Sequence, residues 1–139
     1  MDPSSILYED NHLIALNKKS SEIVQGDRTG DATMPDAIKS YLKKKYNKPG
    51  NVFCGVIHRL DRPTSGAILF ARTSKGLERM NKQFRDKETA KTYWAILENK
   101  PPNASGTLRN YLKKNEKQNK SYVTSKDTKG AKEAILHYR

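Results

Sequence analysis

The sequence predicts an α+β fold in which a mixed, mainly antiparallel sheet is flanked by two helices. Short apolar runs recur along the chain between turn-forming residues, as in strands joined by tight connections. Two segments in the first two thirds of the chain instead repeat apolar residues every three or four positions, which is typical of amphipathic helices. Strands with two helices among them, followed by strands alone, favour α+β over a parallel α/β sheet.

The chain begins with a predicted hairpin. Ile6–Tyr8 and Leu13–Leu16 are short apolar runs, and the polar turn at residues 10–12 between them contains Asn11. Alternating apolar residues around such a turn are typical of two antiparallel strands. Residues 18–33 are polar and contain glycine, so we expect a loop after the hairpin.

Residues 33–46 are predicted to form the first helix. Thr33 is a suitable N-cap, Pro35 fits the first turn and Asp36 complements the helix dipole. The apolar stripe consists of Ala37, Ile38, Tyr41 and Leu42. The end of this helix is rich in lysine, at Lys39, Lys43, Lys44, Lys45 and Lys48. This run is either a patch that faces a polyanion such as RNA or a solvated helix end favoured by the dipole.

The middle of the chain predicts two strands and a second helix. Residues 53–57 and the continuous apolar run 67–72 are predicted strands, the second of them buried. Ser74 is the expected N-cap of an amphipathic helix that ends near Arg85. Its core-facing stripe consists of Leu77, Met80 and Phe84.

The remaining predicted elements are strands. Residues 89–98 form the clearest long strand, because their side chains alternate, and Pro101 ends it. Shorter strands are predicted over residues 106–112, 120–124 and 133–138. The tail from residue 111 to 139 carries eight basic and three acidic residues, so we expect poor order there unless a downstream segment pairs with it.

Composition limits the classes of function. The 139 residues include 27 Lys and Arg against 15 Asp and Glu, and the net charge of +12 favours a long polyanion as partner, although a merely soluble basic surface would show the same excess. The single cysteine, Cys54, excludes an internal disulfide and a cysteine zinc cluster and predicts a reduced, cytoplasmic setting. No segment has the pattern of a membrane span or a signal peptide, and the three histidines lack metal-ligand spacing.

The segment that carries most chemical information is residues 58–66, which read His-Arg-Leu-Asp-Arg-Pro-Thr-Ser-Gly. Its proline and glycine favour a loop, and an isolated aspartate in a loop is commonly only a turn former. Here, however, Arg59 and Arg62 flank Asp61 on both sides. Adjacent guanidinium groups favour the ionised carboxylate and can also hold phosphates, so Asp61 is a candidate base or nucleophile.

Three segments resemble motifs of one family. Residues 58–66 are similar to the signature of the RluA-type family of RNA pseudouridine synthases, His-Arg-Leu-Asp-x-x-Thr-Ser-Gly, and match every fixed position. Residues 91–95, Lys-Thr-Tyr-Trp-Ala, resemble the family's Lys-x-Tyr-x-Ala strand, and residues 6–18 resemble the usual start of its catalytic domain. Three motifs in the family's order carry far more weight than one short motif.

The resemblance implies the fold and the reaction. The family isomerises specific uridines to pseudouridine in structured RNA, either rRNA or tRNA, without net oxidation or hydrolysis, so no metal, nucleotide or other cofactor is implied. Asp61 would be the catalytic aspartate, as nucleophile or base. Tyr93 would stack on the uracil ring and serve in proton transfer, although an ordinary strand tyrosine is the alternative.

Three basic residues would contact RNA if the resemblance holds. Arg59 would enter the RNA in place of the flipped nucleotide, or else would only pair with Asp61. Arg62 would contact phosphate, and Lys91 would meet either a phosphate or a carboxylate. His58, beside these residues, is expected to be structural.

The resemblance also has a limit. The family's later motif, Thr-Gly-Arg-x-His-Gln-Ile-Arg, whose first arginine pairs with the catalytic aspartate, has no counterpart in this chain. We therefore expect residues 1–139 to be the N-terminal portion of a catalytic domain, without a separate N-terminal RNA-binding domain, and weakly active or inactive alone. An interrupted sheet would leave an unpaired edge through which copies could self-associate.

Two other interpretations explain part of the sequence. A non-catalytic RNA-binding module on the same scaffold explains the charge, but it has no need of a carboxylate at Asp61 facing a polyanion. A basic ribosome-associated structural protein also explains the charge but not residues 58–66.

Overall fold

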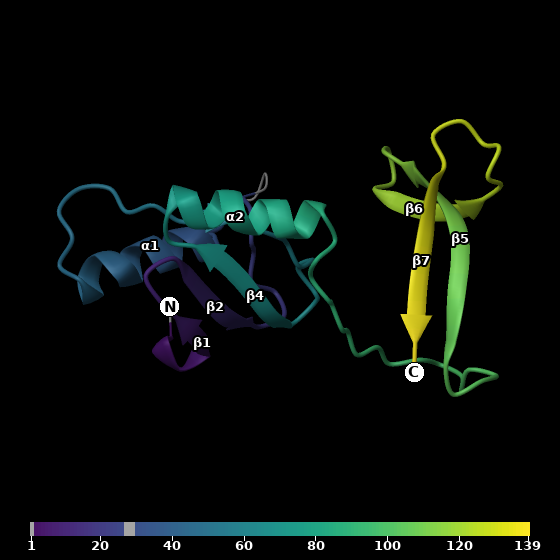
Figure 1. Ribbon diagram of the computed structural model, residues 1–139, viewed down its shortest axis with the longest axis horizontal. Coiled ribbons are helices and arrows are strands. Elements are labelled where there is room, and N and C mark those ends of the chain that lie inside the picture. Colours follow the sequence, from purple (N-terminus) through teal and green to yellow (C-terminus); the bar gives the residue numbers. More distant parts are fainter. Residues whose placement is uncertain (1, 27–29) are drawn as a thin grey trace. The chain divides into compact units, whose positions relative to one another are not determined.

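A computed structural model describes residues 2–26 and 30–139 and contains helices and antiparallel sheets, which confirms the α+β class (Figure 1). The chain divides into two units, Met1–Thr92 and Tyr93–Arg139, and each contains its own sheet. Every strand pair in both sheets is antiparallel, which confirms the mainly antiparallel pairing that the sequence predicts, and the described residues contain no parallel pair that would make a sheet mixed. The predicted loop at 18–33 includes residues 27–29, which lie outside the described residues.

The sheet of the first unit has the strand order β1-β2-β4-β3. The predicted hairpin is confirmed as β1 (Ile6–Glu9) and β2 (Leu13–Lys18), preceded by a short 3₁₀ turn at Pro3–Ser5. β2 pairs along its whole length with β4 (Gly66–Ala71), while β3 (Gly55–Val56) covers only the third and fourth residues of the predicted strand at 53–57. β2 and β4 therefore place residues 18 and 66 next to each other at one end of the sheet.

The core of the first unit lies between β2, β4 and the helix α1 (Met34–Lys45). Residues two apart in a strand share a face, so Ile14 and Leu16 of β2 lie on the same face as the residues that pair with them, Phe70 and Ile68. These four side chains are buried, together with Ile38, Leu42, Met34 and Val24. Burial of each large apolar side chain stabilises the fold by about 1.5–3 kcal/mol.

Helix α1 begins as the sequence predicts. Thr33 has extended backbone and accepts a hydrogen bond from the Asp36 N–H, while the Asp36 carboxylate accepts one from the Thr33 N–H. This reciprocal capping box satisfies two backbone donors that the helix itself leaves free. The helix ends at Tyr46, whose N–H reaches back to the Leu42 carbonyl.

Helix α2 (Ser74–Arg85) packs against β3 and β4. Its N-cap is Thr73 and not Ser74, because Thr73 has the extended backbone and its hydroxyl accepts from the Gly76 N–H at 3.0 Å. A Cβ at Gly76 would lie 2.9 Å from the His12 carbonyl oxygen, so this position needs glycine for the helix to approach the β1–β2 turn. The predicted stripe Leu77, Met80 and Phe84 is half-buried.

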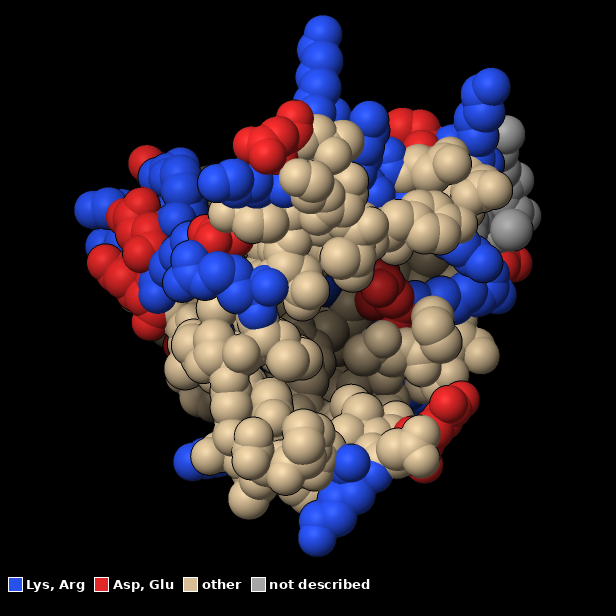
Figure 2. Space-filling model, turned by 90° about the vertical axis from the view of Figure 1, so that its right-hand side faces the viewer, with Lys and Arg blue, Asp and Glu red and all other residues tan. Residues whose placement is uncertain are grey.

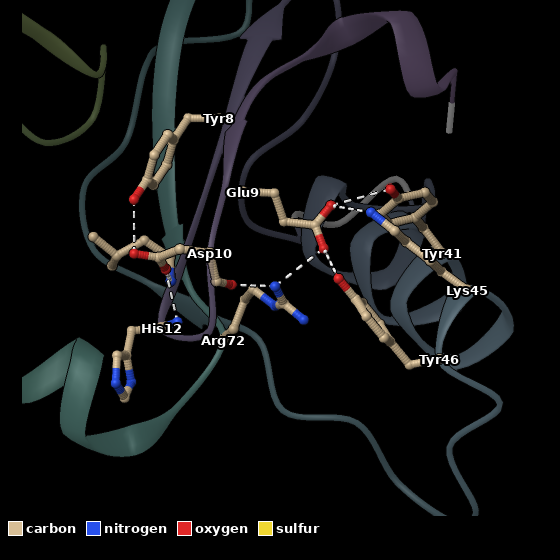
Figure 3. Close-up of polar contacts among 9 residues, drawn as sticks. Tyr8, Glu9, Asp10, His12, Tyr41, Lys45, Tyr46 and Arg72 are labelled. Carbon is tan, nitrogen blue, oxygen red and sulfur yellow. Dashed lines mark hydrogen bonds and ion pairs between the residues drawn. The ribbon is translucent and has the colours of Figure 1, made fainter.

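A polar network joins β1 to α1 (Figure 3). The Glu9 carboxylate accepts hydrogen bonds from the hydroxyls of Tyr41 and Tyr46 and from the Lys45 ammonium, which lies 2.9 Å away. Arg72, which follows β4, completes the network with an ion pair of 3.0 Å to Glu9 and a hydrogen bond to the Asp10 carbonyl. Because Glu9 and Arg72 are both nearly buried, each charge depends on the other groups for stabilisation.

The second unit is a three-stranded sheet with the order β6-β5-β7. Its strands are β5 (Gly106–Asn115), β6 (Lys120–Thr124) and β7 (Lys132–Tyr138), which confirms the last three predicted strands with small changes in their ends. These strands take up most of residues 111–139, so the poor order expected there is wrong. Both β6 and β7 pair with β5 inside the chain itself.

The long strand predicted over residues 89–98 is wrong. This segment has neither helix nor strand, and its large side chains are exposed, with Trp94 at 99% and Ile96 at 103% of their full accessible areas. Alternation alone does not make a strand, which also needs a neighbour for its backbone hydrogen bonds. No neighbouring strand pairs with residues 89–98 in the part of the chain that the structure describes.

Candidate active site

Asp61 lies in a tight turn that leads into β4. The Thr64 N–H donates to the Asp61 carbonyl at 3.0 Å, which closes the turn across Arg62 and Pro63. Gly66, the first residue of β4, has φ of +127°. Residues other than glycine adopt this backbone conformation only with strain. The predicted loop is thus confirmed, and its glycine is required where the turn joins the strand.

A buried lysine, Lys18, binds the backbone of this turn through hydrogen bonds. The Lys18 ammonium, at the end of β2, donates to the carbonyl oxygens of Asp61 and Arg62, both at 3.1 Å, and to that of Thr64 at 2.6 Å. It also donates to the Lys19 carbonyl at 3.2 Å. Lys18 has no exposed surface, which is rare for a lysine and requires such hydrogen-bond partners.

The electrostatics of Lys18 follow from this position. Burial lowers the pKa of the Lys18 ammonium from its usual value, and the negative charges of Glu22 and Asp61 oppose that shift. A second contact fixes the turn from the same side, since the Ser21 N–H donates to the Arg62 carbonyl at 2.8 Å. The backbone that carries Asp61 is therefore anchored to the segment after β2 by several hydrogen bonds.

The Asp61 side chain itself is exposed. Among residues 2–26 and 30–139 its carboxylate forms no hydrogen bond and no ion pair within 4.0 Å. An exposed carboxylate on a fixed backbone, with both oxygens free, has the arrangement that a nucleophile or base needs.

The two arginines expected beside Asp61 have other partners. Arg59 is exposed and donates to the side-chain oxygen of Gln25 at 2.7 Å. Arg62 is also exposed and forms an ion pair of 3.5 Å with Asp31. The pairing of Arg59 with Asp61, one of the two alternatives given by the sequence, is therefore not the arrangement found here.

His58 is structural, as expected. Its Nε2 accepts a hydrogen bond from the Leu69 N–H of β4 at 3.1 Å, and its ring stacks on Phe84 of α2 with 5.0 Å between centroids. Burial and, to a smaller extent, the positive charge of Lys91 lower the pKa of His58. Both effects favour the neutral ring that the hydrogen bond from Leu69 requires. His58 thus joins the start of the motif to β4 and α2.

The remaining predicted site residues lie in the segment between α2 and β5. Lys91 is exposed, and its charge acts on His58 within the first unit. Tyr93 is 61% exposed and begins the second unit, whereas Asp61 belongs to the first. The meeting of Asp61 and Tyr93 at one uridine stays a prediction.

A cavity of about 330 Å³ lies near the turn, between Arg62, Glu22 and the start of α1 at Thr33 and Met34. Asp61 is not among the residues that line it. The described residues contain no group of three or more His, Cys, Asp or Glu side chains placed to hold a metal ion. They also contain no helix long and apolar enough to cross a membrane.

The chain can now be compared with known proteins. The sequence profile of the RNA pseudouridylate synthase family matches residues 12–139, which include the Asp61 turn and every strand except β1. The chain belongs to this family. Ribosomal large subunit pseudouridine synthase C of Rickettsia prowazekii is 34% identical over 134 residues, which are 96% of this chain. Synthase D of Borreliella burgdorferi is 30% identical over 141 residues, covering 99% of this chain.

The matches cover nearly all of this chain but less than half of each of the two relatives. This member of the RNA pseudouridylate synthase family spans 42% of the length of each of those two proteins. Among solved structures, human RNA pseudouridylate synthase domain containing 4 superposes with a TM-score of 0.76 at 20% identity, over 95% of this chain and 51% of the human one. Human RNA pseudouridylate synthase domain containing 1 superposes with a TM-score of 0.70 at 18% identity, over 96% of this chain and 50% of the human one. Both confirm the fold.

Sequence reasoning missed Lys18 as part of the site. Lys18 is the last residue of the opening segment that resembles the family, and no role in the site was predicted for it. A signal was present, because Lys18 continues the buried alternation of Ile14 and Leu16 along β2. A lysine on the core face of a strand calls for polar partners there, and the carbonyls of the Asp61 turn supply them.

Proposed function

We propose that the protein isomerises specific uridines to pseudouridine in structured RNA, with Asp61 as the catalytic carboxylate. The observation that carries the proposal is the combination of an exposed, unpaired Asp61 carboxylate with a turn that Lys18 fixes at three carbonyl oxygens. Membership of the RNA pseudouridylate synthase family supports the reaction, and the names of the relatives point to rRNA as substrate, with tRNA as the other RNA class.

The reaction needs a group that tolerates and stabilises positive charge at the sugar. The bond from uracil N1 to the ribose breaks with its electron pair on the base, the base turns, and C5 forms the new bond. C5 then loses its proton and N1 gains one, so atoms and electrons balance without a cofactor. A carboxylate can attack the sugar or the base, or accept the C5 proton, and the position of Asp61 is compatible with each role.

The basic residues expected to contact the RNA are all accessible to solvent. Arg59, Arg62 and Lys91 all expose their side chains to solvent. The neutral Gln25 is the partner of Arg59, and the ion pair of Arg62 with Asp31 is exposed, so neither arginine needs to break a buried contact to reach RNA. We propose that Arg59 fills the space left by the flipped uridine and that the other two contact phosphate.

Release of tritium from RNA labelled at uridine C5 tests the proposal in the complete protein. Asp61→Asn should abolish release, since the amide cannot act as nucleophile or base. Asp127→Asn, which changes an exposed aspartate of the β6–β7 connection, is the matched control and should retain activity. Equal activity of Asp61→Asn and wild type would overturn the catalytic role. RNA binding with no activity in the wild type would instead favour a non-catalytic module.

For the 139-residue chain alone we propose weak or absent activity. It spans less than half the length of the curated relatives named above. The arginine motif that pairs with the family's aspartate is also absent from its sequence.

A further inference from the structure

The sheet of the second unit has two chemically different faces. Its register pairs Lys113 with Tyr122 and Tyr111 with Thr124, and residues that pair directly share a face. One side, which we call the tyrosine face, carries Arg109, Tyr111, Lys113, Lys120, Tyr122 and Glu133, together with Thr107, Ile135 and His137. The opposite side carries Leu108, Leu112, Val123 and Leu136, together with Lys114, Lys132 and Tyr138.

Contacts on the sheet confirm the assignment of its faces. On the tyrosine face, Arg109 donates to the Glu133 carboxylate at 2.7 Å and Thr107 bonds the His137 ring at 2.8 Å. On the opposite face, the Tyr138 ring lies over Gly106, where a Cβ would be 2.8 Å from its hydroxyl oxygen. The alternation therefore runs unbroken along β5.

The tyrosine face has the composition of a surface for unpaired nucleotides. Tyr122 is 49% exposed, and its ring stands directly opposite the exposed Lys113. Aromatic rings on a strand offer flat surfaces on which any base can stack, and neighbouring cations contact the phosphates. With Glu133 balancing Arg109, Lys113 and Lys120 leave this face a net positive charge. On the face of the molecule that Figure 2 shows, Lys and Arg side chains project all around the rim, with acidic groups among them.

We propose that the tyrosine face binds unpaired segments of the RNA substrate, by base stacking on Tyr122 and Tyr111 and phosphate contacts from Lys113. The inference rests on the proposed function for the choice of RNA as partner. It adds a second binding surface, on the unit that does not contain Asp61. Bases that are already paired in a stem cannot stack on these rings, so the surface selects loops and single strands.

The test measures filter binding of the 139-residue chain to a labelled oligouridylate of about 12 nucleotides and to an RNA duplex of similar length. Tyr122→Leu should weaken binding of the single strand roughly tenfold, which lies within the range that stacking contributes per base, and should affect the duplex far less. Tyr122→Phe retains the ring and loses only the hydroxyl, which bonds Gln118, so it should bind like the wild type.

Lys113 and Lys114 allow the contribution of charge on the tyrosine face to be tested against a matched control. They are adjacent in β5, both exposed, and their side chains lie on opposite faces. Lys113→Gln should weaken binding and lower the slope of log affinity against log salt by about 0.7, the value for one phosphate contact on a single strand. Lys114→Gln should change neither, since Lys114 is on the other face and already pairs with Glu116.

Two results would overturn the proposal. One is single-strand affinity of Tyr122→Leu equal to that of the wild type, and the other is an equal loss in Lys113→Gln and Lys114→Gln. Binding by the tyrosine face does not depend on Asp61, so Asp61→Asn should bind the oligouridylate normally. If Asp61→Asn lost tritium release while Tyr122→Leu bound normally, only the RNA surface would be refuted. If Tyr122→Leu lost binding while Asp61→Asn kept full activity, only the catalytic proposal would be refuted.

Discussion

The Lys18 ammonium lies 2.6 Å from the carbonyl oxygen of Thr64, 46 positions further along the chain. This contact and its neighbours to Asp61 and Arg62 tie the end of β2 to the turn that carries the proposed catalytic group. The buried Lys18 ammonium and the Ser21 N–H, which donates to the Arg62 carbonyl, thus fix the position of the Asp61 backbone.

Replacement of Lys18 should destabilise the first unit. Lys18→Met retains the volume of the side chain but leaves buried carbonyl oxygens without a donor, so we expect a loss of about 2–3 kcal/mol in the free energy of unfolding. Urea denaturation measures it. Lys19→Met removes the same charge from an exposed neighbour and should change the free energy by less than about 0.5 kcal/mol. Equal midpoints for the two variants would show that the Lys18 contacts contribute little.

The Glu9 network should make stability depend on pH. Burial raises the pKa of Glu9, but hydrogen bonds from Tyr46, Lys45 and Tyr41 and the charge of Arg72 outweigh it, and the net pKa lies below the usual value of 4.5. A lowered pKa in the folded state contributes stability that is present above the unfolded pKa and is lost as the pH falls through the folded one.

Glu9→Gln tests this dependence. Unfolding measured from pH 7 to pH 3 should show wild-type stability falling below about pH 4.5, and the variant should lack the part of that fall due to Glu9. At neutral pH the variant should be less stable by about 2 kcal/mol, because Arg72 loses its buried partner. If the free energy of unfolding of wild type and variant fell equally between pH 7 and pH 3, Glu9 would have no role in the loss of stability at acid pH.

His58 should titrate below its usual pKa of 6.5, because burial and the charge of Lys91 both favour the neutral ring. Its folded pKa is lowered, so stability is highest above pH 6.5 and decreases as the pH falls toward the folded pKa. NMR titration of the ring protons measures this value directly. Lys91→Gln should raise the pKa of His58, whereas Lys87→Gln, which removes a charge that is not among those acting on His58, should leave it unchanged.

The segment 89–98 should exchange its amide hydrogens much faster than β2 and β4. It has no strand partner among the described residues, while β2 is paired on both sides, with β1 and with β4. Hydrogen exchange followed by mass spectrometry would compare peptides from the two regions. Slow exchange over residues 89–98 would mean that this segment pairs in solution.

Self-association through a sheet edge stays a prediction. β6 and β7 are the outer strands of the second sheet, and each leaves one edge without a partner in the part of the chain that the structure describes. Sedimentation equilibrium should show a mass that rises with concentration, and Ile135→Pro should reduce it because proline in an edge strand disfavours pairing with a further strand. A constant monomer mass at high concentration would contradict this.

The sequence predicted local structure well where the deciding groups are neighbours in the chain. The capping box of Thr33 and Asp36 lies within four residues, and the β1–β2 hairpin is fixed by the turn at Asp10, whose carboxylate accepts from the N–H groups of His12 and Leu13. It failed where partners are distant. Alternation over residues 89–98 cannot show whether a neighbouring strand exists, and the role of Lys18 depends on carbonyls more than 40 positions away. The flanking arginines were placed beside Asp61 by sequence adjacency, but their side chains bond Gln25 and Asp31.

The exposure of Trp94 gives the molecule an optical reporter. It is the single tryptophan of the chain, and the residue has 99% of its full accessible area. Its emission should therefore lie near the maximum of free indole in water and be strongly quenched by iodide. Any partner that orders residues 89–98, whether RNA or the remainder of a longer protein, should shift the emission to shorter wavelength. Binding to this region can thus be followed on the unlabelled chain.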